Sequence, residues 1–246
     1  PDVHGKKLYF AHRETNDCDI YFLNNHTDSI VSGLYTFKTK YQYAQLWDAV
    51  SGKRYRLSAN QGLVTLRLSP RESCFVVFSN NDEQLDDKPL LSRHHVIDSK
   101  WTIDFNCRYQ GVGQMECKEL KYWNKSENSK IRYYSGTAVY KTSFEWKDIK
   151  SAVFLLLPSN NCVTEVYINK KKAGLIWCSP WNLDISPYLK EGKNELSLEV
   201  TNSWNNRAVG DLRLKNDKTI WKPELFVSEN SLLQDAGLQG DIMLVF

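Results

Sequence analysis

Short apolar runs separated by turn-forming residues recur along the first third of the chain. Leu63–Leu68 (LVTLRL) alternates with a period of two, which is typical of a strand with one buried face and one wet face. Turn-forming residues fill Asn24–Asp28, Ser51–Lys53 and Ser69–Pro70 between the runs. The strands predicted here are Lys7–His12, Asp19–Leu23, Ile30–Phe37, Leu63–Leu68 and Ser73–Phe78. Strands at this spacing, with no helical pattern between them, predict an antiparallel β-sandwich.

A polar and acidic stretch, Ser79–Asp87 (SNNDEQLDD), then interrupts the strand pattern and reads as a linker or a long surface loop. We therefore predict two domains, residues 1–87 and 88–246. Within the second domain, Ala152–Leu157 (AVFLLL) is continuously apolar, as expected of a strand covered on both faces. Its predicted strands are Trp101–Phe105, Ala138–Phe144, Ala152–Leu157, Val163–Asn169, Glu195–Asn202 and Asp241–Phe246. The fold class predicted for the chain is all-β, with two antiparallel β-sandwich domains.

Composition supports this prediction and excludes several classes of protein. Aromatic residues are abundant, with 8 Trp, 13 Tyr and 10 Phe against 2 Met, and aromatic rings favour strands. A net charge of +3 over 246 residues gives no basic face for a nucleic acid, so no nucleic-acid partner is predicted. No apolar run reaches the ~18 residues of a membrane span. Because the sequence starts at Pro1 without Met, we expect a processed product or a fragment.

The cysteines and the lysines offer no clear functional site. Six cysteines could form three disulfides or remain free thiols, and their spacing matches no metal-binding pattern, so no metal ligand is predicted. Asn169–Lys172 carries three lysines and is interpreted as the solvated tip of a hairpin, with a polyanion site as the alternative.

No catalytic motif is present, and no catalytic residue is predicted. The chain lacks a Gly-rich phosphate loop, a GxSxG elbow and an HExxH helix. Carboxylates are plentiful, but spacing alone places no two of them across a substrate. Asp184, which precedes Ile185–Pro187, is interpreted as a turn-former or cap rather than as a general acid.

Three tryptophans lie in segments rich in Asn, Ser and Pro, where a sandwich places its loops. These are Trp177, Trp181 and Trp204. A flat indole beside amide and guanidinium donors suits carbohydrate, because the ring covers C–H faces while the donors bind hydroxyls. The alternative is that these tryptophans plug the ends of the sandwich, since Trp is highly buried on average.

Several segments resemble a known family of enzymes. They include Gln45–Asp48 (QLWD), Arg132–Gly136 (RYYSG), Val166–Asn169 (VYIN) and Val200–Leu212 (VTNSWNNRAVGDL). Together they resemble the C-terminal part of the bacterial α-L-rhamnosidases of glycoside hydrolase family 106. The sequence departs from that pattern at Ala49, where the family usually has Pro.

The resemblance implies a β-sandwich followed by a galactose-binding-like jelly-roll, similar to the sugar-binding domain of family 2 β-glycosidases. In that family the catalytic carboxylates lie in an upstream (β/α)₈-type barrel, and this chain shows no βα alternation. The segment Pro1–Arg13 is interpreted as the tail of that barrel. An upstream catalytic domain of the same polypeptide is therefore the implied partner.

The motif residues that carry over lie in the predicted jelly-roll. For Trp177, Asn202, Asn206, Arg207 and Asp211 the family suggests a loop cluster that faces a glycan or a neighbouring domain. Arg207 and Asp211 are four residues apart, and we favour a structural ion pair for them. No cofactor is predicted; jelly-rolls of this kind sometimes hold a structural calcium ion, and no residue is assigned to one.

The predicted function is that of a non-catalytic accessory region of an α-L-rhamnosidase-like glycosidase acting on polysaccharide. It would support the catalytic domain and bind carbohydrate, with Trp177 and Trp181 as the contact residues. The alternative is a stand-alone carbohydrate-binding or cell-surface interaction module. The resemblance implies a bacterial periplasmic, cell-surface or secreted location.

Overall fold

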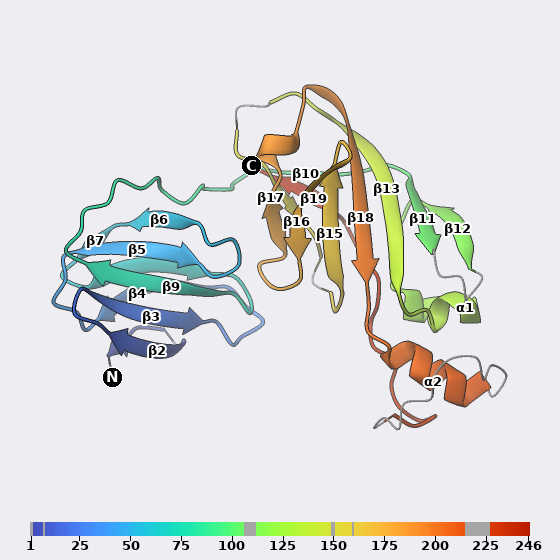
Figure 1. Cartoon of the computed structure of the whole chain (residues 1–246), viewed down its shortest axis with the longest axis horizontal. Helices are drawn as coiled ribbons and strands as arrows, with labels where there is room; N and C mark the ends of the chain where they lie inside the picture. Colours follow the sequence, from blue (N-terminus) through green and yellow to red (C-terminus); the bar gives the residue numbers. More distant parts are fainter. Residues whose placement is uncertain (1, 7, 106–111, 149–150, 159, 215–226) are drawn as a thin grey trace. The chain divides into compact units, whose positions relative to one another are not determined.

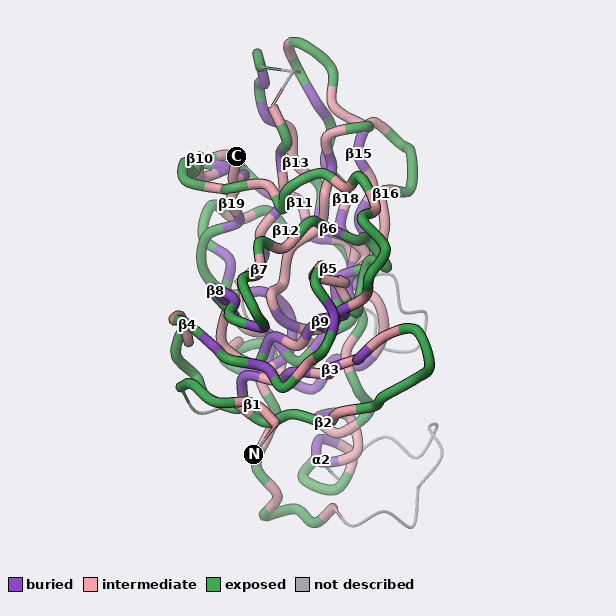
Figure 2. The backbone as a smooth tube through the Cα atoms, turned by 90° about the vertical axis from the view of Figure 1, so that its left-hand side faces the viewer, coloured by how far each residue is buried: buried purple, intermediate pink, exposed green. Residues whose placement is uncertain are grey.

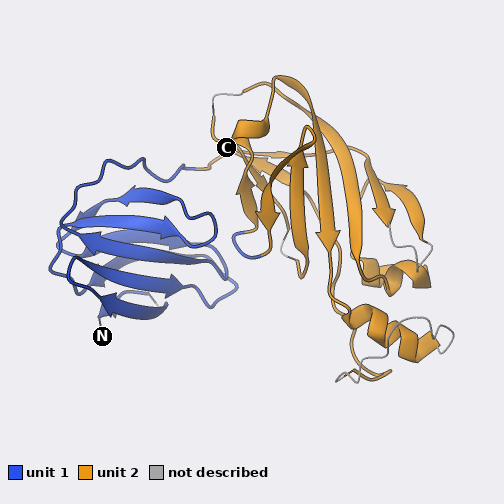
Figure 3. Ribbon diagram, viewed as in Figure 1, with its two compact units in different colours: residues 1–90, 178–180 blue, residues 91–177, 181–246 orange. Residues whose placement is uncertain are grey.

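The computed structural model describes residues 2–6, 8–105, 112–148, 151–158, 160–214 and 227–246. These residues form an almost entirely β structure whose strands pair in the antiparallel sense, which confirms the predicted fold class (Figure 1). The chain divides into two compact units (Figure 3). Unit 1 comprises residues 1–90 with 178–180, and unit 2 comprises residues 91–177 with 181–246.

Unit 1 is a sandwich of two sheets, with strand orders β1-β4-β8-β7 and β2-β3-β9-β5-β6. The strands are β1 (Val3–His4), β2 (Tyr9–Glu14), β3 (Cys18–Asn24), β4 (Val31–Phe37), β5 (Tyr43–Asp48), β6 (Arg54–Leu57), β7 (Ala59–Asn60), β8 (Leu63–Leu68) and β9 (Ser73–Ser79). In β8, Val64, Leu66 and Leu68 are buried while the intervening residues are exposed, as the alternation predicted. The core also holds Tyr21 and Phe78, whose rings pack edge to face.

The first residues of the chain belong to this sandwich, and their interpretation as the tail of a barrel is wrong. β1 pairs with β4, and β2 pairs with β3 from Tyr9↔Asn24 to Glu14↔Asp19. His12, which lies in this segment, stacks on Tyr21 with ring centroids 4.1 Å apart. Residues 9–14 form the edge strand β2 beside β3, so they complete the five-stranded sheet. Lys7, the predicted start of this strand, lies outside the described residues.

The predicted linker Ser79–Asp87 is tied to unit 1. Its first residue ends β9, and two of its carboxylates then bind arginines of β6. Arg54 donates to Glu83 in a bidentate pair, and Arg56 donates in the same way to Asp87. These two surface ion pairs attach the polar segment to β6 of unit 1.

Unit 2 is a jelly-roll-like sandwich with strand orders β12-β11-β13-β18-β15-β16 and β10-β19-β14-β17. The strands are β10 (His94–Val96), β11 (Trp101–Phe105), β12 (Gly113–Cys117), β13 (Thr137–Trp146), β14 (Phe154–Leu156), β15 (Val163–Ile168), β16 (Lys171–Ile176), β17 (Asn182–Asp184), β18 (Gly192–Thr201) and β19 (Met243–Val245). Buried positions alternate with less buried ones along β11, β15 and β18, and Figure 2 colours the backbone by burial. The core includes Tyr140, Leu155, Val166, Leu198 and Leu244.

Three details of unit 2 differ from the sequence predictions. The turn of the lysine-rich hairpin consists of Asn169 and Lys170, with φ of 51° and 68°, and the next two lysines begin β16 instead of forming the tip. Short helical turns η1 (Trp123–Lys125), α1 (Ser129–Arg132) and η2 (Ser186–Tyr188) connect strands. A longer helix, α2 (Asn205–Leu214), occupies the segment that the resemblance placed in a loop.

Candidate functional site

Two of the predicted site residues lie where strands of the six-stranded sheet end. β16 and β18 run in the same direction, because each is antiparallel to β15 between them. Thr164 of β15 pairs with both Ile176 and Val200, and this register brings the ends of β16 and β18 level with each other. Trp177 and Asn202 are therefore the first residues of two loops at the same edge of the sheet. Only β15 lies between the strands that these loops follow.

The predicted tryptophans divide into exposed and packed side chains. Trp177 is 55% exposed and Trp204 is 60% exposed, so both present indole surface to solvent. Trp181 instead packs against the core of unit 2, and its carbonyl accepts a hydrogen bond from the backbone N–H of Leu157 at 3.0 Å. Of the two predicted carbohydrate contacts, Trp177 has the accessible ring, whereas Trp181 contacts the end of the sandwich core.

Asn202 and Asn206 use their side-chain amides within the fold. Asn202 Oδ1 accepts from the backbone N–H of Gly136 at 3.0 Å, and its Nδ2 donates to the carbonyl of Tyr134 at 2.8 Å. Asn206 is buried and bonds both backbone groups of Gln234, at 2.7 and 2.8 Å. Since both amides are engaged in this way, a sugar hydroxyl would have to displace an internal hydrogen bond to reach them.

Arg207 and Asp211 form the ion pair that their spacing suggests, but on helix α2. Arg207 Nε lies 2.8 Å from Asp211 Oδ1, and both side chains are largely covered. The helix packs closely on Tyr133, because a Cβ at Gly210 would overlap the ring of that tyrosine. The pair therefore braces a helix that is fixed to the body of unit 2, and the description of these residues as a loop is corrected.

Several of the carboxylates that the sequence offers are held in structural contacts. Asp184 Oδ1 accepts from the backbone N–H of Ser186 at 3.0 Å and from its hydroxyl at 2.6 Å, which confirms the predicted capping role. Asp48 accepts backbone N–H bonds from Val50 and Ser51 in a turn. Others pair with cations: Glu116 with Lys100, Glu119 with Lys121, and Glu165 with Lys172.

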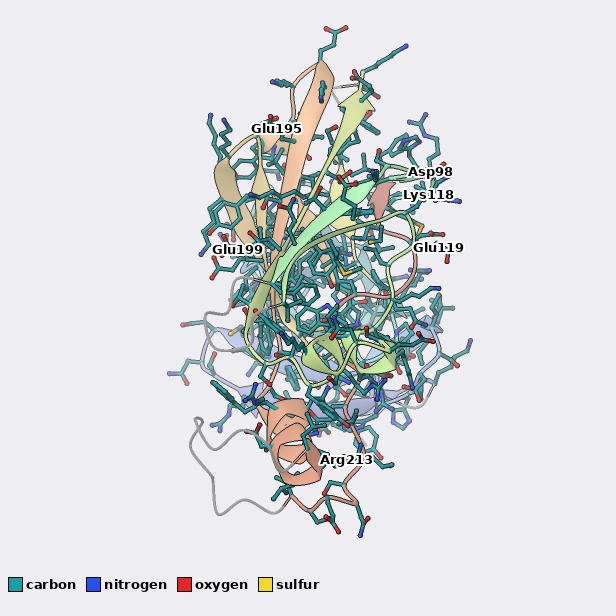
Figure 4. All side chains as sticks on the ribbon, turned by 90° about the vertical axis from the view of Figure 1, so that its right-hand side faces the viewer. Asp98, Lys118, Glu119, Glu195, Glu199 and Arg213 are labelled. Carbon is teal, nitrogen blue, oxygen red and sulfur yellow. The ribbon has the colours of Figure 1, made fainter. Side chains whose placement is uncertain are left out.

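A groove that sequence reasoning missed lies on the outer face of the six-stranded sheet and has a volume of about 610 Å³. Its lining includes Lys141, Tyr167, Glu195, Ser197 and Glu199. Figure 4 shows Glu195 and Glu199 on one side of unit 2, and Asp98, Lys118 and Glu119 on the other. The polar residues of β18 alternate with buried apolar ones, and this alternation was the signal that could have identified the face.

The cysteines of the described ranges form no disulfide with one another. Burial raises the pKa of the Cys74 thiol to about 12 and also raises the pKa of Cys162. Within the same ranges, no group of three or more His, Cys, Asp or Glu side chains is arranged to hold a metal ion. Among the described helices, none is both long and apolar enough to cross a bilayer.

Comparisons with known proteins connect the chain to glycoside hydrolases. No protein-family model matches it. A Formosa agariphila protein named "Putative beta-glucuronidase" is 37% identical over 121 residues, which are 48% of this chain and 10% of that protein. The structure of a rhamnosidase from Novosphingobium sp. PP1Y matches 100% of this chain and 25% of its own, with a TM-score of 0.86 and 26% identity. A Ruminococcus gnavus β-glucuronidase matches 64% of the chain at 16% identity and a TM-score of 0.47.

The chain thus spans about a tenth of the curated relative and a quarter of the rhamnosidase chain. The rhamnosidase match runs through both units, and its identity extends the likeness beyond the fold. These similarities make the chain a glycoside-hydrolase-associated region built from two β-sandwich units.

Proposed function

We propose that this chain is a non-catalytic accessory region of a family 106-like α-L-rhamnosidase that acts on polysaccharide. The observation that carries the proposal is the match of the whole chain to one quarter of a rhamnosidase structure. In this proposal the two sandwiches support a catalytic domain of the same polypeptide, which is the partner. The parent enzyme acts outside the bacterial cytoplasm, in the periplasm, at the cell surface or as a secreted protein.

The contacts of the carboxylates support a non-catalytic role. A glycosidase of the usual kind needs two carboxyl groups facing one glycosidic bond, one of them free to exchange a proton. Glu165 and Asp184 instead accept hydrogen bonds from neighbouring side chains or backbone groups. Glu195 and Glu199 lie on an open sheet face whose groove is also lined by lysines.

The test is a turnover assay of the purified chain with aryl α-L-rhamnosides and aryl β-D-glucuronides. We expect no release of the aryl group above the uncatalysed rate. Glu199→Gln and Glu195→Gln serve as matched variants, because each keeps the shape of the side chain and removes the acid. Hydrolysis that either variant abolishes would overturn the non-catalytic assignment.

Carbohydrate binding at Trp177 is a second candidate function, favoured by the 55% exposure of this indole at the sheet edge. Calorimetric titration with rhamnose-, galactose- and uronate-containing glycans tests it. Trp177→Ala should remove the part of the heat that comes from binding at this edge, whereas Trp204→Ala, which removes a similarly exposed indole near α2, should leave the heat unchanged. Flat heats for all glycans would indicate that this edge has a structural role only.

A further inference from the structure

A second pocket lies entirely within unit 1, on the outer side of its five-stranded sheet. It has a volume of about 500 Å³ and is formed by β5, β6, the turn between β2 and β3, and the residues after β9. Its lining includes Asn16, Gln45, Trp47, Arg54, Asn81 and Glu83. The volume lies within the range of about 300–1,000 Å³ that is usual for small-molecule sites.

The aromatic wall of this pocket is fixed by a network of hydrogen bonds. Trp47 Nε1 donates to Gln45 Oε1 at 2.8 Å, and Gln45 Nε2 donates to Glu83 Oε2 at 3.2 Å. Gln45 is buried, and its amide orients the indole through this hydrogen bond. A wall that is already ordered loses little conformational entropy when a ligand binds.

Arg54 completes the network from the neighbouring strand. It is paired with Trp47 in the β5–β6 register, and its guanidinium carbon lies 5.9 Å from the centroid of the Trp47 ring. Its two terminal nitrogens donate to the two oxygens of Glu83, at 2.7 and 2.6 Å. The positive and negative charges therefore neutralise each other inside the pocket.

The rim of the pocket supplies polar groups that are exposed. Asn16, Asn80 and Asn81 line it and are exposed, and Asp17 adds one carboxylate. An amide both donates and accepts hydrogen bonds, as a hydroxyl does, so amides match the hydroxyl groups of a sugar. With Arg54 neutralised by Glu83, the extra carboxylate disfavours an anionic ligand.

We propose that this pocket is a carbohydrate-binding site that takes a neutral pyranose unit. The indole of Trp47 covers the C–H face of the sugar, and the asparagine amides bind its hydroxyls. The site lies in a different unit from Trp177 and does not depend on the assignment to a rhamnosidase.

The experiment uses the whole chain in a Trp177→Ala background, which removes the candidate contact at the sheet edge of unit 2. Methyl α-L-rhamnopyranoside, methyl β-D-galactopyranoside, methyl β-D-glucopyranoside and oligosaccharides of these sugars are titrated, with glucuronate and inorganic phosphate as charged probes. We expect saturable binding of at least one neutral glycan and weaker binding of both anions. Trp47→Ala should lower the affinity about tenfold or more.

Two further measurements separate binding from folding. Asn80→Ala with Asn81→Ala should weaken binding while leaving the unfolding curve unchanged, because both residues are exposed. In an amide NMR titration, the side-chain signals of Asn80 and Asn81 should shift with the ligand. Absence of saturable binding for every neutral glycan would overturn the proposal, as would shifts confined to unit 2 or tighter binding of glucuronate.

Discussion

The two units are both antiparallel sandwiches, but they differ in how far apart in the sequence their paired strands lie. In unit 1, β2 pairs with β3, β5 with β6 and β7 with β8 across short connections, and the pairing of β3 with β9 joins Cys18 to Ser79. In unit 2, β19 fills the gap between β10 and β14, so that His94 faces Val245. The core of unit 2 therefore depends on residues after 227, whereas the sheets of unit 1 are complete at Ser79.

The outer faces of the two large sheets also differ in chemistry. In unit 1, Phe22, Phe75 and Trp47 lie opposite one another on adjacent strands and form an aromatic row. In unit 2, Ser197 lies opposite both Lys141 and Tyr167, which gives a polar row. An aromatic row beside exposed amides suits the C–H faces of a sugar, and a row of charges and hydroxyls remains solvated.

The largest effect should come from breaking the closure of unit 2. Gly237 has φ of 81°, and a Cβ at this residue would overlap the buried Trp123 indole. Strain and overlap together predict that Gly237→Ala lowers the free energy of unfolding by about 4 kcal/mol, measured by urea denaturation. Gly240→Ala is the control, because Gly240 has φ of 96° but open space around it, so the cost should be about 1 kcal/mol.

If the two alanine variants were equally stable, the packing of residues 236–238 on Trp123 would not hold unit 2 together. Trp123 Nε1 donates to Tyr140 at 2.6 Å, so a shift of this indole also disturbs a strand at the centre of the sheet. The loss should therefore extend to the core of unit 2.

A matched change in unit 1 should have a slightly smaller effect. Leu23 has no exposed surface, and Leu23→Ala removes buried methyl groups from a core that cannot fully collapse. We expect a loss of about 3 kcal/mol in the free energy of unfolding. Leu34→Ala, on a neighbouring sheet but 61% exposed, should change it by less than about 0.5 kcal/mol. Equal losses for the two leucines would contradict the burial pattern of unit 1.

The strands that bury an alternating face could be predicted from the sequence. β8 and β11 were predicted with the bounds they have, because each directs every second side chain into a core. β12 was missed since it is an edge strand whose residues are mostly exposed, and β16 since its first two residues are lysines. Edge strands bury too little apolar surface to leave a clear pattern.

Helix α2 could not be predicted from its own residues. It begins with two asparagines and contains Gly210, all of them residues with weak helix preference. The helix forms because Gly210 allows a close approach to Tyr133 and because Gln234 binds Asn206. Both partners are distant in the sequence, so only the tertiary structure reveals why this segment is helical.

The contacts of the predicted site residues also could not be predicted from the sequence alone. Their types suit sugar recognition, but a residue type does not say whether its polar groups face a ligand or the fold. Asn202 and Asn206 turned out to bond backbone groups far along the chain. Conversely, Glu83 was interpreted as part of a linker, and it is the residue that joins Gln45 to Arg54 in the unit 1 pocket.

The next prediction concerns the side-chain amide of Asn206, which forms hydrogen bonds within the fold. Asn206→Ala leaves the backbone groups of Gln234 without their buried partner, which should cost about 2 kcal/mol of the free energy of unfolding of the chain. Asn205→Ala, one residue earlier and only half-buried, should cost less than about 1 kcal/mol. The measurement is urea denaturation, with glycan titration alongside. A variant that lost glycan affinity at unchanged stability would instead indicate that Asn206 contacts a ligand.

The smallest effect concerns the polar outer face of unit 2. Lys172 Nζ donates to Glu165 Oε2 at 2.7 Å and Tyr167 donates to the same oxygen at 3.1 Å, and these bonds lower the pKa of Glu165 below its ordinary value of 4.5. A carboxyl whose pKa is lower in the folded state stabilises the fold above its unfolded pKa, and this contribution disappears as the pH falls through the folded pKa.

Lys172→Ala should therefore raise the pKa of Glu165 in an NMR titration of its side chain, with almost no change in stability at neutral pH because the pair is exposed. Lys171→Ala removes a neighbouring charge that makes no contact with this carboxyl in the β15–β16 pairing, and it should move the pKa less. Equal shifts for the two variants would mean that Glu165 responds to the general charge of the hairpin. The outer face of unit 2 would then hold no specific ion pair at this hairpin, in contrast to the ordered polar network of unit 1.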